Sequence, residues 1–284
     1  MKHLLNKTLP IFLSITLILG SLFWVGVQKA YASVIVVQTA FGGSQTTLPT
    51  VSISPTAGNT LIVAYGEYNE NSSCTSRNIL ATDNLSDTFT RDNRVPVFSS
   101  SFGTYQCVQI FRLTNIPSGI TSVSLTGNGG SWNGGTVSVL EVSGLAASPV
   151  DAVDSVGAVC ASNNWQTAAM TPTAGLNELI FGQSYNANAN IYAETLPYHM
   201  IGSEGSGASG TGAGGYQIVT STSGSYTPSG VANSSGNFCM AAGITYKAAG
   251  GGGTTTTPSA GIKILQAGGI DIKQNGGINI TTNK

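Results

Sequence analysis

The chain of 284 residues has little charge of either sign. Asp, Glu, Lys and Arg make up 8% of it, and 11 basic against 12 acidic residues give a formal net charge of -1. An ordinary soluble domain has about a quarter charged residues. Nucleic-acid binding needs basic residues to neutralise phosphates, so no nucleic-acid partner is expected. Hydrophobic residues still make up 41% of the chain, which is enough to form a core and argues against disorder.

Residues that serve in catalysis are also scarce. The chain has 2 His, and His199 lies near no nucleophile motif. Glu67, Glu141 and Glu178 fall on or beside expected strands, and a glycosidase needs two carboxylates about 5 to 10 Å apart. The Glu-x-Asp-x-x-Glu arrangement of jelly-roll hydrolases is missing. We therefore interpret these glutamates as strand-end residues facing water, and we expect the protein not to be an enzyme.

The first residues have the pattern of an export signal. Lys2 and Lys7 precede an apolar run over 11–27, and residues 30–32, Ala-Tyr-Ala, supply the small side chains that signal peptidase requires. We expect residues 1–32 to be a signal peptide, and the alternative is an uncleaved membrane anchor. The sequence thus predicts a secreted, extracellular or cell-surface protein that has no membrane contact after signal cleavage.

Four cysteines follow this signal. No two are spaced as Cys-x-x-Cys, and His199 is the only histidine after the signal, so a zinc site has too few plausible ligands. In an oxidising compartment an even number predicts disulfides, although four cysteines allow three connectivities. Cys74 with Cys107 and Cys160 with Cys239 is the favoured pairing, because each pair then stays near one half of an internal repeat. The alternative is buried free thiols.

The body of the chain is patterned for strands. Residues 34–247 form short runs rich in Val, Ile, Thr and Tyr, broken by Gly, Asn, Ser and Pro. In 122–126 and 136–139 apolar residues alternate with Ser or Thr, which places one face on a core and the other in water. This pattern predicts an all-β sandwich or barrel. Because Ser and Thr replace charged residues, the sheet edges are poorly protected against pairing.

An internal repeat divides this body. Residues 55–58, Pro-Thr-Ala-Gly, lead into a strand containing Leu61, and the same tetrapeptide at 172–175 leads into a strand containing Leu179. No Pro- or Ser-rich linker separates the copies. We therefore interpret residues 33–247 as one jelly-roll-type β-sandwich built from two half-repeats. Two separate sandwiches are the alternative.

The two Pro-Thr-Ala-Gly strands, with residues 138–145 and 148–151 between them, resemble a repeat-built module found in secreted bacterial and phage-tail proteins. The resemblance covers residues 34–247. It implies a jelly-roll or concanavalin-A-like sandwich and an extracellular role in recognition or adhesion. It supplies no catalytic residues that could be transferred to this chain.

Composition changes after the body. Residues 248–261 are rich in Gly and Thr and predict a flexible linker. Residues 262–284 repeat Gly-Ile-x-Ile every eight residues and predict a short β-rich tail, which buries too little apolar area to be stable alone. The tail is expected either to join a partner's sheet or other copies of itself, or else to fold back on its own body or stay disordered.

Two tryptophans are the candidate ligand-binding residues. Trp132 and Asn133 lie within the glycine-rich segment 129–135, and Trp165 has Ser and Asn neighbours. An exposed indole can stack on a sugar while Asn133 donates or accepts hydrogen bonds. The alternative is that these rings cover the end of the core.

Three aspartates are the candidate metal ligands. Asp83, Asp87 and Asp92 crowd one segment, and such oxygen donors suit calcium. Asx side chains that cap turns are the alternative, and no other cofactor is expected.

These patterns together predict a non-catalytic extracellular module for adhesion to a glycan or another cell-surface polymer, or for recognition of it. The alternative is a structural subunit of an extracellular filament or coat, assembled by self-association through residues 262–284. A polysaccharide-acting enzyme is the third hypothesis.

Overall fold

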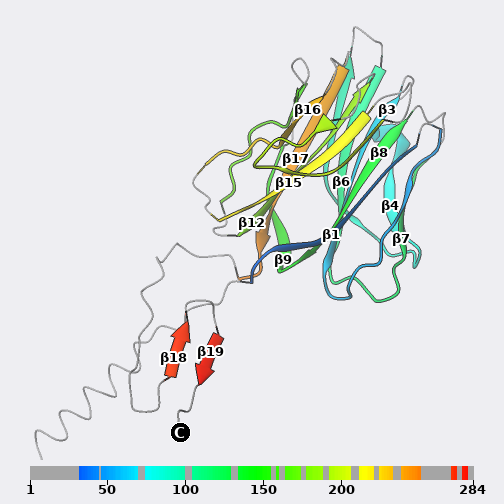
Figure 1. The fold of residues 1–284 in the computed structure, drawn as a ribbon. Helices are drawn as coiled ribbons and strands as arrows, with labels where there is room; N and C mark the ends of the chain where they lie inside the picture. The colour runs from blue at the N-terminus through cyan, green and yellow to red at the C-terminus, as the bar shows by residue number, and fades with distance from the viewer. Residues whose placement is uncertain are drawn as a thin grey trace, which may run out of the picture.

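The computed structural model of the chain is built from antiparallel β-sheets, as Figure 1 shows. Within the described part, no helix is both long and apolar enough to span a bilayer. The structure describes residues 32–44, 46–69, 74–99, 104–128, 134–154, 158–159, 164–173, 177–187, 192–205, 211–220, 224–232, 238–250, 270–273 and 277–280.

The first half of the chain forms a five-stranded sheet, which we call sheet A. Its central strand pairs on both sides along nearly its whole length, and its residues 60–67 are buried on both faces because other sheets pack above and below it. The order across the sheet is β1 (Ile35–Ser44), β8 (Gly135–Ser143), β3 (Thr60–Asn69), β6 (Thr104–Leu113) and β5 (Thr90–Ser99).

The second half forms a comparable sheet, which we call sheet C. Its central strand begins directly after the second Pro-Thr-Ala-Gly segment, as the central strand of sheet A follows the first. The order is β10 (Ala158–Val159), β17 (Phe238–Ala248), β12 (Glu178–Ala187), β15 (Thr211–Val219) and β14 (His199–Gly205), and β9 (Leu145–Val153) also pairs with β17.

Two three-stranded sheets and two small elements complete the described structure. Sheet B contains β2 (Thr50–Ser52), β7 (Ser122–Thr126) and β4 (Leu80–Asp83) in that order. Sheet D contains β11 (Asn164–Gln166), β16 (Ser229–Ala232) and β13 (Tyr192–Ala193). The small elements are the helix α2 (Cys74–Arg77) and the C-terminal hairpin of β18 (Ile270–Lys273) and β19 (Gly277–Ile280).

The two large sheets pack face to face around one apolar core. Its members alternate along each strand, because successive strand residues point to opposite faces. Glycines shorten the distance between the sheets at the end of this core, where Gly66 lies against Tyr185 and Gly212 against Thr136. The buried residues of this core include Ile62, Ala64, Val108, Ile110, Leu140, Leu179, Phe181, Met240, Ile244 and Tyr246.

Each small sheet covers the outer face of a large one. Leu61, Val63 and Phe111 of sheet A pack against Val51 and Val123 of sheet B. On the other side, Trp165 of sheet D lies against Gly215 of sheet C. The prediction of an all-β sandwich is confirmed. The body has four layers, however, and not the two that were expected, because each repeat contributes a large sheet and its own small cover.

The internal repeat is visible in the strand order. The first copy has the orders β1-β8-β3-β6-β5 and β2-β7-β4, and the second has β9-β17-β12-β15-β14 and β11-β16-β13 in the same spatial relation. Each copy is therefore a complete pair of sheets. The sequence had predicted that each copy would supply only half of one sandwich. The two copies still form one body through the shared core between sheets A and C.

The two ends of the sandwich differ. At one end the chain enters and leaves the body, since Ala32 N–H donates to Ala249 O at 3.3 Å and Ala249 N–H donates to Gly144 O at 2.7 Å. At the opposite end the strands of both large sheets turn back, as the register pairs Asn69 with Tyr105 and Ala187 with Phe238 show. We call this opposite end the loop end.

Candidate functional site

The loop end collects segments from both repeats. Besides the two pairs above, Ser99 lies opposite Thr104 and Gly205 opposite Thr211. Gly66 contacts Tyr185 across the core, so the loop ends of the two large sheets coincide. In sequence, the connections leaving here consist mainly of Asn, Ser and Gly: they are 70–73, 100–103, 129–133, 188–191, 206–210 and 233–237.

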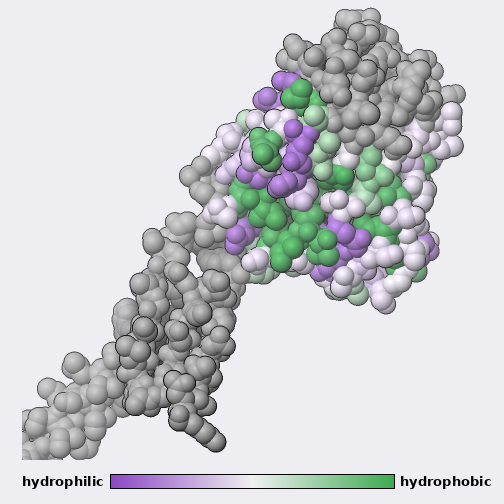
Figure 2. All heavy atoms as spheres, in the orientation of Figure 1, coloured by the Kyte–Doolittle hydropathy of each residue, from purple (hydrophilic) through white to green (hydrophobic). Residues whose placement is uncertain are grey.

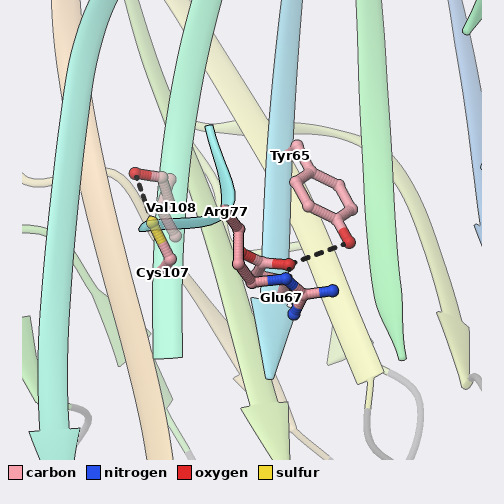
Figure 3. Close-up of polar contacts among 5 residues, drawn as sticks. All are labelled: Tyr65, Glu67, Arg77, Cys107 and Val108. Carbon is pink, nitrogen blue, oxygen red and sulfur yellow. Dashed lines mark hydrogen bonds and ion pairs between the residues drawn. The ribbon is translucent and has the colours of Figure 1, made fainter. Parts of the chain in front are cut away.

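A buried charged cluster forms the floor of this end (Figure 3). Arg77 Nη1 lies 3.2 Å from Glu67 Oε2, and Tyr65 O–H donates to the same oxygen at 3.3 Å. Tyr65 and Glu67 are two residues apart on β3 and therefore share one face of it, and α2 brings Arg77 to them. Each of the three residues is at most 2% exposed. The cluster ties α2 to sheet A at the end of β3.

The same cluster fixes both sides of the segment that contains Trp132. On its N-terminal side, Asn128 N–H donates to Arg77 O at 2.8 Å. On its C-terminal side, Gly135 pairs with Glu67 and lies over the Tyr65 ring, where an added Cβ would come within 2.5 Å of Cε2. Only glycine fits there. The sequence therefore places Trp132 on a connection of five residues whose two flanks are held by one buried cluster.

Burial controls the protonation of this cluster. Desolvation raises the pKa of Glu67 to about 7, although Arg77 and the Tyr65 hydrogen bond act to lower it. Burial, reinforced by the Glu67 charge, also raises the pKa of Tyr65 well above its usual value. Tyr65 is thus a hydrogen-bond donor at any pH at which the protein would work.

Cys107 adjoins this floor and is disulfide-bonded. It pairs in register with Glu67, and α2, which begins at Cys74, lies against β6. A disulfide sulfur has no proton to donate, so we interpret the 3.9 Å approach of its Sγ to Val108 O as a van der Waals contact. The side chains of Cys74, Cys160 and Cys239 lie outside the described residues, so the pairing stays a prediction.

We expect peptide mapping under non-reducing conditions to join Cys74 to Cys107 and Cys160 to Cys239. The neighbourhood of α2 and β6 favours the first pair. The β10–β17 register, which pairs Val159 with Met240, points toward the second. A matched digest after reduction is the control, and a peptide joining Cys74 to either Cys160 or Cys239 would contradict the pairing.

The candidate ligand-binding residues are only partly placed. Trp132 and Asn133 lie outside the described residues. Trp165 is described, and it is 1% exposed, with its ring against Gly215 and Gly230 between sheets C and D. The prediction that Trp165 binds a ligand is therefore wrong, because a sugar can stack only on an exposed ring face. Its polar neighbours in sequence gave no hint of this burial, which depends on strands that pair from elsewhere in the chain.

The glutamates considered for catalysis do not converge. Glu67 pairs with Gly135 at the start of β8, whereas Glu141 lies six residues further along that strand. At about 3.4 Å per residue the two are roughly 20 Å apart, twice the separation that a glycosidase uses. Glu178 is fully buried at the start of β12 in sheet C. All three were expected to face water, and all three are buried.

Glu141 instead stabilises the first Pro-Thr-Ala-Gly turn. Its carboxylate accepts hydrogen bonds from Thr56 N–H at 2.9 Å, Gln38 Nε2 at 2.5 Å and Asn59 Nδ2. Burial acts to raise the pKa of Glu141, but the hydrogen bonds outweigh burial and lower it.

The second turn is held in an analogous way by a carboxylate from the neighbouring strand. Asp151 on β9 accepts bonds from the backbone N–H and, at 2.8 Å, from the hydroxyl of Thr173. Thr173 is the second repeat's counterpart of Thr56, so a carboxylate at this turn is shared by both copies. Its role is structural.

The predicted calcium ligands have other partners. Asp83 Oδ1 accepts from Leu85 N–H at 2.9 Å and from Asp87 N–H at 3.0 Å, which is the Asx turn given as the alternative. Asp92 is bound by Arg112 at 3.1 Å and by the Tyr246 hydroxyl at 2.9 Å. Among the residues that the structure describes, no three acidic, His or Cys side chains are grouped as metal ligands. The three aspartates therefore do not form the predicted site.

A second surface feature lies on the side of the sandwich. A groove of about 420 Å³ runs between β1 and the β14–β15 pair, and we call it the edge groove. Figure 2 shows a hydrophobic patch on the face that β1 crosses. The groove was not predicted, because it forms where the edges of two sheets distant in sequence meet. Its lining is Val34, Ile35, Val36, Pro197, His199, Tyr216, Gln217 and Ile218.

Sequence reasoning also missed the floor of the loop end. Arg77 was not singled out, although a lone Arg in a stretch otherwise free of basic residues is a usable sign of a buried ion pair. Tyr65 gave no such sign.

Comparison with known proteins finds no relative of this chain. A scan against protein-family models matches none, and searches of curated proteins and of solved structures find no similar protein.

Proposed function

We propose that the protein is a non-catalytic extracellular module that uses its loop end to bind a glycan or another surface polymer. The observation that supports this most is the polarity of the body. Both chain ends leave at one end, beside Ala32 and Ala249, and connections from both repeats gather at the other. A module attached at one end and presenting loops at the other has the arrangement of many recognition domains.

The composition of the loop end fits this role. Asn, Ser and Gly dominate its connections, and such residues supply adaptable hydrogen bonds. Trp132 adds an aromatic ring, and the Tyr65, Glu67 and Arg77 cluster holds both flanks of its segment. A rigid floor lowers the entropy cost of ordering a binding loop. Strand order β1-β8-β3-β6 with β2-β7-β4 supports the jelly-roll assignment within the same proposal.

Replacing Trp132 by Ala is expected to weaken binding about 30-fold, which corresponds to about 2 kcal/mol for an aromatic anchor. Asn133→Ala should cost about 1 kcal/mol through one lost hydrogen bond. Binding is measured first on a glycan array and then by titration with the polymer that the array identifies.

Leu85→Ala is the matched control, because Leu85 is 46% exposed and lies in the turn after β4. It should bind as wild type does. Wild-type protein that binds no glycan or polymer would contradict the proposal, and so would Trp132→Ala protein that binds as tightly as wild type.

A structural subunit is the second candidate function, and the edge groove is the observation that favours it. A polysaccharide-acting enzyme has less support, because Glu67 and Glu141 serve an ion pair and a turn about 20 Å apart.

A further inference from the structure

We propose that the edge groove binds the isoleucine face of the C-terminal hairpin from a second copy of the chain. This goes beyond the proposed function, since the groove lies on the side of the body and the recognition surface at its loop end. Four observations lead to it: the strand beside the groove, the pattern of the hairpin, the place where the linker begins, and the charges of the two parts.

The strand beside the groove is an unprotected edge. Over residues 35–41 β1 has no charged residue and no proline, and Ile35 and Val37 are 53% and 47% exposed. The opposite edge of sheet A is guarded, because β5 contains three charged residues and Pro96. Natural proteins usually protect long apolar edges, so an unprotected one indicates a contact surface.

The hairpin has a complementary pattern. Its register pairs Ile270 with Ile280 and Ile272 with Ile278, so these four residues share one face of the two strands. Asp271 and Asn279 occupy the other face. An isolated two-stranded hairpin is marginally stable in water at best, and a face of four isoleucines needs a cover.

Position and charge favour contact between a tail and a groove. The chain leaves the described body at Gly250, next to Ala249, which is bonded to Ala32, so each groove lies near the point where a tail starts. Residues 33–250 have five basic and eleven acidic residues, whereas 251–284 have three basic and one acidic. The tail and the body therefore attract each other.

Each copy offers one groove and one hairpin. Such a contact joins different surfaces of two identical chains, and it extends into an open chain when the rotation between copies does not close a ring. The structure thus assigns the predicted self-association of residues 262–284 to a specific receiving surface.

The test uses two full-length variants. Ile35→Glu places a carboxylate in the groove and leaves the hairpin intact. Ile272→Asp places a carboxylate on the hairpin and leaves the groove intact. Each should be monomeric by analytical ultracentrifugation, with a dissociation constant raised about a hundredfold, because a desolvated carboxylate finds no partner there. An equimolar mixture should form a one-to-one complex through the intact groove of one and the intact hairpin of the other.

Leu80→Glu is the matched control, because Leu80 is 47% exposed on another edge strand, β4, and this variant should assemble as wild type does. Wild-type protein that stays monomeric at high concentration overturns the proposal, as does a mixture that stays monomeric. Faster hydrogen exchange of β1 in monomeric Ile272→Asp, relative to monomeric wild type, would show that the hairpin covers its own groove, which also overturns it.

Discussion

Replacing Arg77 by Met will lower the free energy of unfolding by about 1.4 kcal/mol at pH 8, because Glu67 loses its buried cation and must then keep its proton one pH unit above its present pKa of about 7. Glu67 and Arg77 are 1% and 2% exposed, so water cannot substitute for the lost partner. The measurement is equilibrium denaturation of the oxidised protein in guanidinium chloride.

The size of this loss should depend on pH. The folded-state pKa of Glu67 is about 7, above the value of about 4.3 in an unfolded chain. Between these values the folded protein keeps a proton that the unfolded chain has released, so Glu67 lowers stability as pH rises through this window. Without Arg77 its pKa rises further. The Arg77→Met loss should therefore be small at pH 5 and should grow by about 1.4 kcal/mol for each pH unit above 7, up to the raised pKa.

Two further variants make this test specific. The double variant Glu67→Gln with Arg77→Met should recover much of the stability at pH 8, because no buried charge remains. Arg94→Met, which removes a partly exposed Arg from β5, should cost less than about 1 kcal/mol. An Arg77→Met loss that is equal at pH 5 and pH 8 would refute the assignment of its energy to the Glu67 charge.

Trp165→Ala is expected to cost about 3 to 5 kcal/mol, the range for deleting a buried aromatic ring. The ring fills the space above Gly215 and Gly230, so its removal leaves a cavity between sheets C and D. Trp165→Phe should cost much less. The Trp165 Nε1 atom has no hydrogen-bond partner among the described residues, so phenylalanine gives up volume but no hydrogen bond.

Denaturant titration of both variants measures this difference. If Trp165→Phe destabilises the protein as much as Trp165→Ala, the indole nitrogen has a partner and the ring is more than a space-filling residue. Glycan binding by Trp165→Phe should match wild type, whereas Trp132→Ala should lose it. That contrast separates the core tryptophan from the proposed binding tryptophan.

The internal repeat shows what the local sequence pattern can predict and what it cannot. The sequence aligns Leu61 with Leu179, since both follow Asn by two residues after a Pro-Thr-Ala-Gly turn. In the structure Leu61 packs against sheet B, whereas Leu179 packs in the core between the two large sheets. The second copy has one more residue before its Asn, and a shift of one residue in a strand exchanges its two faces.

The prediction of candidate sites was limited in the same way, because it grouped residues that are close in the sequence. Asp83 and Asp92 are close in the chain and were grouped for that reason, yet Asp92 binds Tyr246 from the other repeat. Conversely, the edge groove unites Val34 with Tyr216, which are far apart in sequence. Proximity along the chain is a weak guide in an all-β protein, because most of its contacts join distant strands.

The amino-acid sequence alone determined the all-β class and the position of the repeat, since alternation and turn residues act within a few residues of one another. Tertiary structure decided that each copy has two sheets, that Trp165 is in the core, and that Glu67 and Arg77 meet. Those outcomes follow from which distant strands pair and which faces pack together. Pairing and packing are settled by the burial energy of the whole body, which no single segment contains.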